Sequence, residues 1–239
     1  MYQKLLQDFL DWLHPALCLG CGLIPQKNIS FCECCLGYLK EKQCSFCSQC
    51  GFRVSVGLPT LLKCPNCQLV KYPFDKIAVL GEYRGGLRDL ILKGKGRSGE
   101  LLMEAMGVIL AKEKHDFLMG LGKMEVCSVP SPWLRRLKRG HNPAESLASG
   151  LAWKLGWNFS PGILQRARSS PRQAFLPKTL RIKNMHGAFR SNLRGKNLPE
   201  KVLLVDDVMT TGATLIEAVK VLKAGGVSEV FPIVLARTP

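Results

Sequence analysis

Long hydrophobic runs and acidic side chains are both scarce in this chain of 239 residues. No run of 18 or more uncharged apolar residues occurs, and a membrane-spanning helix needs about 20, so we expect no membrane span. Only 18 Asp and Glu stand against 34 Lys and Arg, which gives a formal net charge of +16 at pH 7. This surplus favours acidic or phosphate-bearing partners.

Aromatic residues make up only 8% of the chain, so platforms for stacking nucleic-acid bases are few. Any binding of single-stranded DNA would therefore be mainly electrostatic and strongly dependent on salt. The basic surplus is also uneven, because residues 135–201 hold fifteen Lys and Arg against two Asp and Glu. Two interpretations of this basic third of the chain remain open. It forms either an ordinary solvated face or a surface that binds pyrophosphate or nucleic acid.

The first 18 residues carry Asp8 and Asp11 within their apolar part, which argues against a secretory signal peptide. Their spacing predicts an amphipathic helix that stops before Pro15. We expect this helix to pack on the domain, with membrane contact as the alternative. A chain with neither signal nor span is expected to be cytoplasmic.

Ten of the eleven cysteines lie in residues 18–67, and eight of them form four CxxC pairs. Each such pair places two thiolates on one tight turn, and two turns complete a four-cysteine zinc site. The chain is then expected to begin with a zinc-ribbon-like region at 1–70, which relies on metal to fold. The predicted ligands are Cys18, Cys21, Cys32 and Cys35 in one set, and Cys47, Cys50, Cys64 and Cys67 in the other.

Alternatives to two zinc sites remain open from the cysteine pattern. Disulfides are one, although they are rare in a reducing compartment. A second alternative is a single metal shared by pairs from different sets. A third is that Cys44, three residues before Cys47, replaces one of the ligands of the second site. Cys34 is left over, whereas Cys127 lies in a predicted strand and is expected to act as a small buried hydrophobe.

The most informative segment is KVLLVDDVMTTGATL, residues 201–215. Four branched apolar residues at 202–205 predict a strand covered on both faces, as in a parallel α/β sheet. Asp206 and Asp207 follow, at the strand end where such sheets bind ligands. The Thr/Gly turn then opens a helix at about Ala213, and hydroxyls, N–H groups and the helix dipole together favour phosphate. Since carboxylates accept hydrogen bonds from ribose hydroxyls, the segment predicts a ribose 5-phosphate site.

Apolar patterning predicts the remaining elements. Strands are expected at 76–82, 125–130, 163–167 and 230–235, and helices at 87–92, 101–112 and 144–155. Residues 93–97 (KGKGR) contain too many glycines for a helix and form either a basic functional loop or a simple linker. The long polar stretch from Arg168 to Asn184 is typical of a lid over an active site or of disorder.

The segment around Asp206 resembles the PRPP-binding motif of type I phosphoribosyltransferases. With the CxxC head, Val129-Pro130, the run 139–142 (RGHN) and the lid residues, nearly the whole chain resembles the ComF family. His141 and Pro143 depart from the family, which usually has an aromatic and a Gln there. The departure puts the contacts on the pyrophosphate side in doubt, and His141 itself is read as a cap or phosphate contact rather than a general base.

The resemblance implies an α/β fold, with a type I phosphoribosyltransferase domain at 71–239 whose parallel sheet is flanked by helices. It implies an enzyme that binds PRPP with Mg²⁺ and transfers phosphoribose to an unknown acceptor. Asp206 and Asp207 would act on the ribose. The rest of the PRPP site would be Val208, Met209, Thr210, Thr211, Gly212, Ala213 and Thr214. The pyrophosphate and lid contacts would be Pro130, Ser131, Arg135, Arg136, Arg139, Arg172 and Arg181.

The same resemblance carries a second hypothesis, because ComF proteins are associated with DNA uptake in natural transformation beside a helicase-like partner. The chain would then be a non-catalytic competence protein that binds single-stranded DNA. PRPP would be a regulatory ligand, or the motif would be a relic. The two hypotheses are compatible, and the Asp206 and Asp207 pair discriminates between them.

Overall fold

The computed structural model describes residues 17–24, 30–40, 45–54, 64–167, 185–193 and 199–239. The predicted N-terminal helix, Cys44, and the lid arginines Arg172 and Arg181 lie outside these residues. Within the described part, no helix combines the length and apolar character needed to cross a bilayer.

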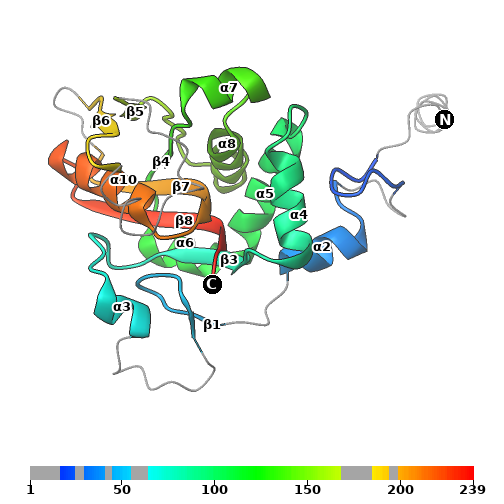
Figure 1. The fold of residues 1–239 in the computed structure, drawn as a ribbon, viewed down its shortest axis with the longest axis horizontal. Coiled ribbons are helices and arrows are strands. Elements are labelled where there is room, and N and C mark those ends of the chain that lie inside the picture. Colours follow the sequence, from blue (N-terminus) through cyan, green and yellow to red (C-terminus); the bar gives the residue numbers. More distant parts are fainter. Residues whose placement is uncertain (1–16, 25–29, 41–44, 55–63, 168–184, 194–198) are drawn as a thin grey trace.

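A four-stranded parallel sheet forms the centre of the structure, in the order β3-β8-β7-β4 (Figure 1). The strands are β3 (Ala78–Glu82), β4 (Glu125–Ser128), β7 (Lys201–Met209) and β8 (Glu229–Arg237). The helices are α2 (Glu33–Lys40), α3 (Pro65–Leu69), α4 (Gly85–Gly94), α5 (Glu100–Glu113), α6 (His115–Leu121), α7 (Trp133–Arg139), α8 (Pro143–Leu155) and α10 (Ala213–Ala224). Two antiparallel pairs lie outside the sheet: β1 (Ser45–Phe46) with β2 (Arg53–Val54), and β5 (Leu164–Arg166) with β6 (Phe189–Ser191).

The sheet is covered on both faces, as the apolar run at 202–205 predicts. Leu203 and Val205 point into one hydrophobic cluster, with residues of α4, α5 and α8. Val202 and Leu204 point into the other, with residues of α10. Alternate residues of a strand face opposite sides, so both sets must be apolar when helices cover both faces. The expected α/β fold with a parallel sheet flanked by helices is confirmed.

The strand that carries the motif is longer than the sequence predicts. β7 runs to Met209 rather than ending at Val205, because β8 continues beside it and pairs Val208 with Ala236 and Met209 with Arg237. Asp206 and Asp207 thus belong to the last part of a paired strand. The helix after the turn begins at Ala213, as expected.

Helices α5 and α8 pack closely because two glycines let their backbones approach. A Cβ on Gly150 would lie 2.0 Å from the carbonyl oxygen of Glu104, and one on Gly107 would lie 2.1 Å from that of Leu147. Backbone atoms cannot swing away as a flexible side chain can, so the helices would have to separate.

We therefore expect Gly150→Ala to lower the free energy of unfolding by about 1–3 kcal/mol, the usual range for overpacking. The matched control is Gly37→Ala in α2, where a Cβ would meet nothing within 4 Å. Alanine there should be neutral or stabilise by up to about 1 kcal/mol, because glycine is the poorer helix former. Urea unfolding of both variants measures the difference, and equal effects would contradict this account of the packing.

The cysteine-rich region flanks the sheet domain and packs on it. Cys18, Phe31, Cys35 and Leu39 are buried in the same cluster as α4 and α5. The β1–β2 pair and α3 lie below the sheet in Figure 1, on a different side from α2. The cysteines thus form two small units, each resting on a different part of the α/β domain.

Candidate functional site

A cavity of about 360 Å³ opens where β4 and β7 end. This is the edge of a parallel sheet at which ligands usually bind. Residues that follow β3, α4 and β4, and the last residue of β5, contribute to it as well. Its lining residues are Tyr83, Lys95, Val129, Pro130, Ser131, Pro132, Arg135, Arg139, Asn142, Ala144, Arg166, Met185, Asp206, Asp207, Val208, Thr210 and Thr214.

The two carboxylates of the motif lie side by side in this cavity with a lysine next to them. The Nζ of Lys95 is 3.1 Å from Oδ2 of Asp207, and both side chains are largely buried, with 22% and 16% of their surface exposed. The backbone N–H of Asp207 donates to Oδ1 of Asp206 at 2.9 Å. One cation thus faces two acids, which leaves the pair with a surplus of negative charge.

Burial raises the pKa of Asp206 to about 8, and the neighbouring Asp207 adds to the rise. The hydrogen bond from the Asp207 backbone and the charge of Lys95 act in the opposite direction but do not outweigh it. Without a ligand, Asp206 therefore holds its proton around neutral pH. A ligand that supplies positive charge or hydrogen-bond donors would favour the ionised form.

This geometry predicts that Asp206→Asn stabilises the unliganded protein. Because the folded pKa lies above the ordinary 3.8, the Asp206 contribution to stability is fully present below that value and is lost as the pH rises toward 8. The melting temperature of the variant should exceed that of wild type by several degrees at pH 8.5, and the gap should shrink toward pH 4. Each kcal/mol corresponds to about 2–4 °C for a chain of this size.

Thermal unfolding across that pH range, in a chelator-free buffer without magnesium, measures the gap. The control is Asp89→Asn, since Asp89 is 70% exposed and forms its ion pair with the adjacent, half-exposed Arg88. A gap that is the same at both pH values, or a destabilised variant, would contradict the assignment.

The turn from Met209 to Thr214, which we call the phosphate turn, joins the carboxylates to α10. Thr210 and Thr214 line the cavity, whereas Thr211 and Ala213 are buried. Gly212 has a φ of +82°, a backbone conformation that residues other than glycine rarely adopt. The Ala213 N–H donates to Oγ1 of Thr211 at 3.3 Å, so the buried hydroxyl braces the turn from inside. The start of α10 then adds the positive end of a helix dipole at the cavity edge.

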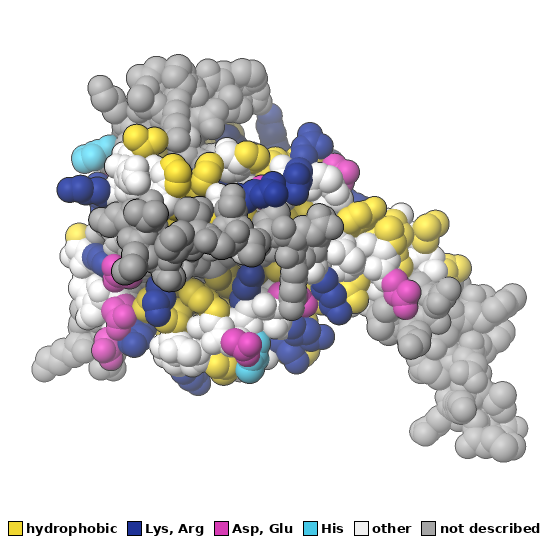
Figure 2. Space-filling model, turned by 90° about the horizontal axis from the view of Figure 1, so that it is seen from below, with side chains coloured by type: hydrophobic (Ala, Val, Ile, Leu, Met, Phe, Trp, Pro, Cys, Tyr) yellow, Lys and Arg dark blue, Asp and Glu magenta, His cyan; other side chains and the backbone are white. Residues whose placement is uncertain are grey.

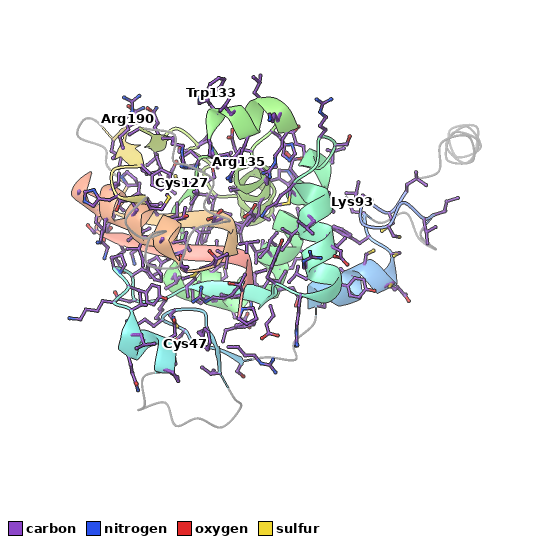
Figure 3. The ribbon with its side chains drawn as sticks, in the orientation of Figure 1. Cys47, Lys93, Cys127, Trp133, Arg135 and Arg190 are labelled. Atoms are coloured by element: carbon purple, nitrogen blue, oxygen red, sulfur yellow. The ribbon has the colours of Figure 1, made fainter. Side chains whose placement is uncertain are left out.

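The three predicted pyrophosphate contacts Arg135, Arg136 and Arg139 lie on a short helix after β4, α7. Their side chains point in different directions. Arg135 and Arg139 line the cavity. Arg136 instead lies 3.6 Å from Glu145 of α8 and lines a separate hollow. Figure 3 shows Trp133 on the outer side of α7 and Arg135 on the side toward the sheet. Adjacent residues of a helix face different ways, which the sequence alone did not resolve for this segment.

Pro130 and Ser131 line the cavity, and Asn142 holds the segment from Val129 to Ser131 by two hydrogen bonds. The Asn142 side chain donates to the carbonyl of Val129 at 3.1 Å and accepts from the Ser131 hydroxyl at 2.7 Å. Asn142 also precedes α8, whose first residue is Pro143, a position where proline costs no hydrogen bond. The residue thus links the start of the helix to the site.

Two cations of the cavity were missed as site residues by the sequence analysis. Lys95 follows α4 directly, so the KGKGR segment serves the site and is no mere linker. Arg166 lies on β5 with its guanidinium 5.4 Å from the Phe189 ring centre, and it donates to the carbonyl of Pro130. Burial and nearby Arg135 lower the pKa of Arg166. The sequence signal that could have identified Lys95 as a site residue is its position between two glycines in a basic segment. Nothing in the sequence near Arg166 indicated that its side chain would line the cavity.

His141 is buried and holds two backbone carbonyls rather than lining the cavity. Its Nε2 is 3.0 Å from the carbonyl oxygen of Gly94, and its Nδ1 is 3.4 Å from that of Arg139. The histidine therefore connects the end of α4, next to Lys95, with the end of α7. This placement favours a structural role over general acid or base chemistry.

The eight predicted cysteine ligands form two quartets, each with its sulfur atoms within 4.8 Å of one another. All eight are free thiols. In the first quartet, Sγ atoms of Cys21 and Cys32 are 3.7 Å apart, and in the second, those of Cys47 and Cys67 are 3.8 Å apart. Zinc–sulfur bonds of about 2.3 Å give a tetrahedron with sulfurs about 3.8 Å apart. Both quartets could therefore hold zinc, and the pairing is within each set rather than between the sets.

The local backbone prepares the first quartet for a metal. Burial opposes the thiolate of Cys18, but hydrogen bonds led by the backbone N–H of Cys32 outweigh it and lower its pKa to about 6. Burial and the neighbouring thiols raise the pKa of Cys35. Crowded thiols cannot all ionise without a cation among them, which is the charge pattern that a structural zinc satisfies. Cys127, in contrast, is fully buried in β4, and burial raises its pKa to about 12.

The chain is similar to proteins of a known family. Residues 137–239 match the phosphoribosyl transferase domain. The DNA utilization protein YhgH of Salmonella typhi is 28% identical over 228 residues, which cover 94% of this chain and 98% of that protein. Competence protein F of Haemophilus influenzae is 29% identical over 211 residues, covering 85% and 90%. One solved structure, titled "Structure of the allosteric regulatory enzyme of purine biosynthesis", covers 55% of this chain and 25% of its own at 22% identity, with a TM-score of 0.37.

The phosphoribosyl transferase match begins inside α7 and includes the whole of β7, the phosphate turn and β8. The match to the DNA utilization protein covers 94% of this chain, so it extends over the cysteine-rich region as well. The chain therefore has a phosphoribosyltransferase-type fold and an N-terminal cysteine-rich region that could bind zinc, and over most of its length it is similar to a DNA utilization protein and a competence protein.

Proposed function

We propose that the chain binds PRPP together with Mg²⁺ and transfers its phosphoribose to an acceptor, releasing pyrophosphate. One observation carries the proposal: a single cavity joins the Asp206 and Asp207 pair, the phosphate turn and the arginines of α7. Ribose, 5′-phosphate and pyrophosphate each need one of these three chemistries. The match to the phosphoribosyl transferase domain supports the same substrate class.

Each part of the site would hold one part of PRPP. Asp206 and Asp207 would accept hydrogen bonds from the ribose hydroxyls, which are donors that carboxylates fit. The N–H groups and hydroxyls of the phosphate turn would bind the 5′-phosphate. Arg135, Arg139 and Lys95 would bind the pyrophosphate through charge-assisted hydrogen bonds.

Magnesium fits this donor set, since it prefers carboxylate and phosphate oxygens. When bound, the ion would neutralise charge on the leaving pyrophosphate. The carboxylate pair lies beside the ribose position, so it would also stabilise positive charge that develops at the anomeric carbon. Arg172 and Arg181 stay predicted lid residues, which would exclude water from that carbon.

The arginines of α7 offer a matched test of this assignment. Arg135→Gln combined with Arg139→Gln should weaken pyrophosphate binding by about 10-fold or more, since each charged hydrogen bond is worth about 1.5–3 kcal/mol. Arg136→Gln removes the same charge from the same helix, but the structure places Arg136 at Glu145, outside the cavity. Its effect should stay below about 2-fold, because exposed pairs contribute little. Calorimetric titration of pyrophosphate decides, and equal losses in the two proteins would contradict the proposal.

A role with DNA is the second candidate, and the surface of α7 favours it. None of its residues is buried, and Trp133, Leu134 and Leu137 are 64%, 51% and 73% exposed. Basic side chains alternate with these apolar ones, a combination suited to phosphate and base stacking. The named relatives are a DNA utilization protein and a competence protein. On the face shown in Figure 2, the visible Lys and Arg are spread among other side chains rather than gathered in one patch.

This candidate predicts that single-stranded DNA binds with an affinity that falls steeply with salt. Trp133→Ala should weaken binding by about 5-fold or more, since stacking is worth about 1–3 kcal/mol per base. Trp153→Ala is the control, because Trp153 is 76% exposed on α8 without the basic neighbours of α7. DNA binding that survives loss of the Asp206 and Asp207 pair would place DNA on a separate surface.

A further inference from the structure

The second cysteine quartet (Cys47, Cys50, Cys64 and Cys67) is linked to the phosphate turn through other side chains, and none of its four cysteines lines the cavity. Two side chains, Arg237 and Tyr72, bridge the gap between the quartet and the turn. Neither is explained by the proposed reaction.

Arg237 forms the first bridge. Its side chain is 4% exposed, and its Nη1 donates to the carbonyl oxygen of Thr210 in the phosphate turn. On the other side, its guanidinium lies 5.9 Å from the ring centre of Phe52. Phe52 belongs to the first knuckle of the quartet, because its carbonyl accepts from the N–H of Cys47 at 2.8 Å. One buried cation thus contacts both the knuckle and the turn.

The backbone at Arg237 is fixed by the neighbouring strands. The Arg237 carbonyl accepts from the N–H of Tyr83, and the N–H of Thr238 donates to the carbonyl of Met209 at 3.0 Å. The Arg237 Nε is buried and finds no acceptor within the described part of the chain. Burying a cationic group with an unpaired donor is costly, so the arrangement depends on the Phe52 ring and the turn being in place together.

Tyr72 forms the second bridge. Its hydroxyl accepts from the side-chain amide of Asn66 at 2.8 Å, and Asn66 lies between the ligands Cys64 and Cys67. The ring edge next to this hydroxyl faces Gly212, where a Cβ would lie 3.1 Å from the ring carbon Cε1. The left-handed conformation of Gly212 is therefore packed by a residue that the second knuckle orients.

We propose that the second quartet is a positioning module for the phosphate turn, so that metal bound there and a 5′-phosphate bound at the turn strengthen each other. The ligand half of this statement rests on the proposed function. Both ligands stabilise one arrangement of Arg237, Tyr72 and the turn, and such coupling is reciprocal by thermodynamic necessity. Loss of zinc at this quartet would then reduce ribose-phosphate affinity without any change in the cavity residues.

The first quartet provides a matched control because it packs on a different element. Lys93 of α4 donates to the carbonyl of Gly20 at 2.7 Å, and a Cβ on Gly20 would lie 2.9 Å from the Leu90 side chain. Figures 1 and 3 show this part of the chain beside α2 and α4, whereas Cys47 lies below the sheet near α3.

Hydrogen exchange at the phosphate turn tests the coupling without any ligand. Cys47→Ser with Cys67→Ser should speed exchange of the Thr211 to Ala213 amides by about 10-fold or more, because the turn would open locally. Cys21→Ser with Cys32→Ser should change it by less than about 2-fold. Arg237→Met, which keeps all eight ligands, should speed exchange while zinc content stays unchanged. Unaltered exchange in Arg237→Met, or equal acceleration by both quartet variants, would overturn the proposal.

Zinc release gives the reciprocal measurement on the full chain. Ribose 5-phosphate should slow release from the second quartet by about 5-fold or more, within the usual range of coupling energies, and leave the first quartet unaffected. Bound ribose 5-phosphate with unchanged release from the second quartet would overturn the coupling. If wild-type protein does not bind ribose 5-phosphate at all, the proposed function fails, and the exchange experiment still decides whether the quartet positions the turn.

Discussion

Replacing Asp206 and Asp207 together by Asn will lower the affinity for PRPP with Mg²⁺ by about 100-fold or more. Each carboxylate that accepts from a buried hydroxyl contributes about 1.5–3 kcal/mol, and an amide can replace neither its charge nor both of its acceptor oxygens. Among the described residues that line the cavity, Asp206 and Asp207 alone are acidic. Isothermal titration of PRPP into wild-type and variant protein measures the loss.

The variant must be shown to fold, and two opposing effects act on its stability. Burial raises the pKa of Asp206, so removal of this carboxylate relieves a strained pair, whereas removal of the Asp207 carboxylate breaks its ion pair with Lys95. A melting temperature close to that of wild type, together with lost PRPP binding, is the expected signature. Full PRPP affinity in the variant would mean that the carboxylates have no role in ligand binding.

Removal of zinc is the second change with a large expected effect. We expect two zinc ions per chain, one at each quartet, because each set of four sulfurs fits one tetrahedral ion. In the described residues, the secondary structure of the two small units consists of α2, α3 and the β1–β2 pair. Structural zinc contributes about 10–16 kcal/mol of apparent binding energy in zinc-finger peptides, so a chelator should unfold these units.

Limited proteolysis before and after chelation measures this effect. Cleavage should begin within the first 70 residues and reach the α/β domain only later, since its core of β7, β8, α5 and α8 does not depend on the cysteines. Metal analysis gives the number of zinc ions per chain. The variant Cys21→Ser with Cys32→Ser, which lacks two ligands of the first quartet, should retain one ion. A stoichiometry of one in wild type, or disulfides between the CxxC pairs, would contradict the account.

The motif on β7 could be predicted from the sequence because its chemistry and its fold signal lie in one continuous segment. An apolar run marks the strand, two acids follow, and glycine at the turn allows the positive φ that the structure shows at Gly212. The cysteine ligands were predictable for a similar reason, as CxxC spacing is local. The choice between shared and separate metal sites, in contrast, required the sulfur positions in the structure.

The contacts that the sequence could not give all join distant segments. Lys95 reaches Asp207 across 112 positions of the chain, and nothing local to either residue signals the other. Arg136 shares the charge and neighbourhood of Arg135, yet it faces Glu145 because helical geometry separates adjacent side chains. The end of β7 was predicted four residues early, since the extension depends on pairing with β8. Tertiary partners, rather than local propensity, decide each of these features.

The most direct test of the central claim is a crystal structure of the chain grown with PRPP and Mg²⁺. The account predicts ribose hydroxyls within hydrogen-bond distance of Asp206 and Asp207, the 5′-phosphate on the N–H groups of the phosphate turn, and the pyrophosphate facing Arg135 and Arg139. PRPP bound elsewhere, or a cavity that stays empty at millimolar PRPP, would contradict it.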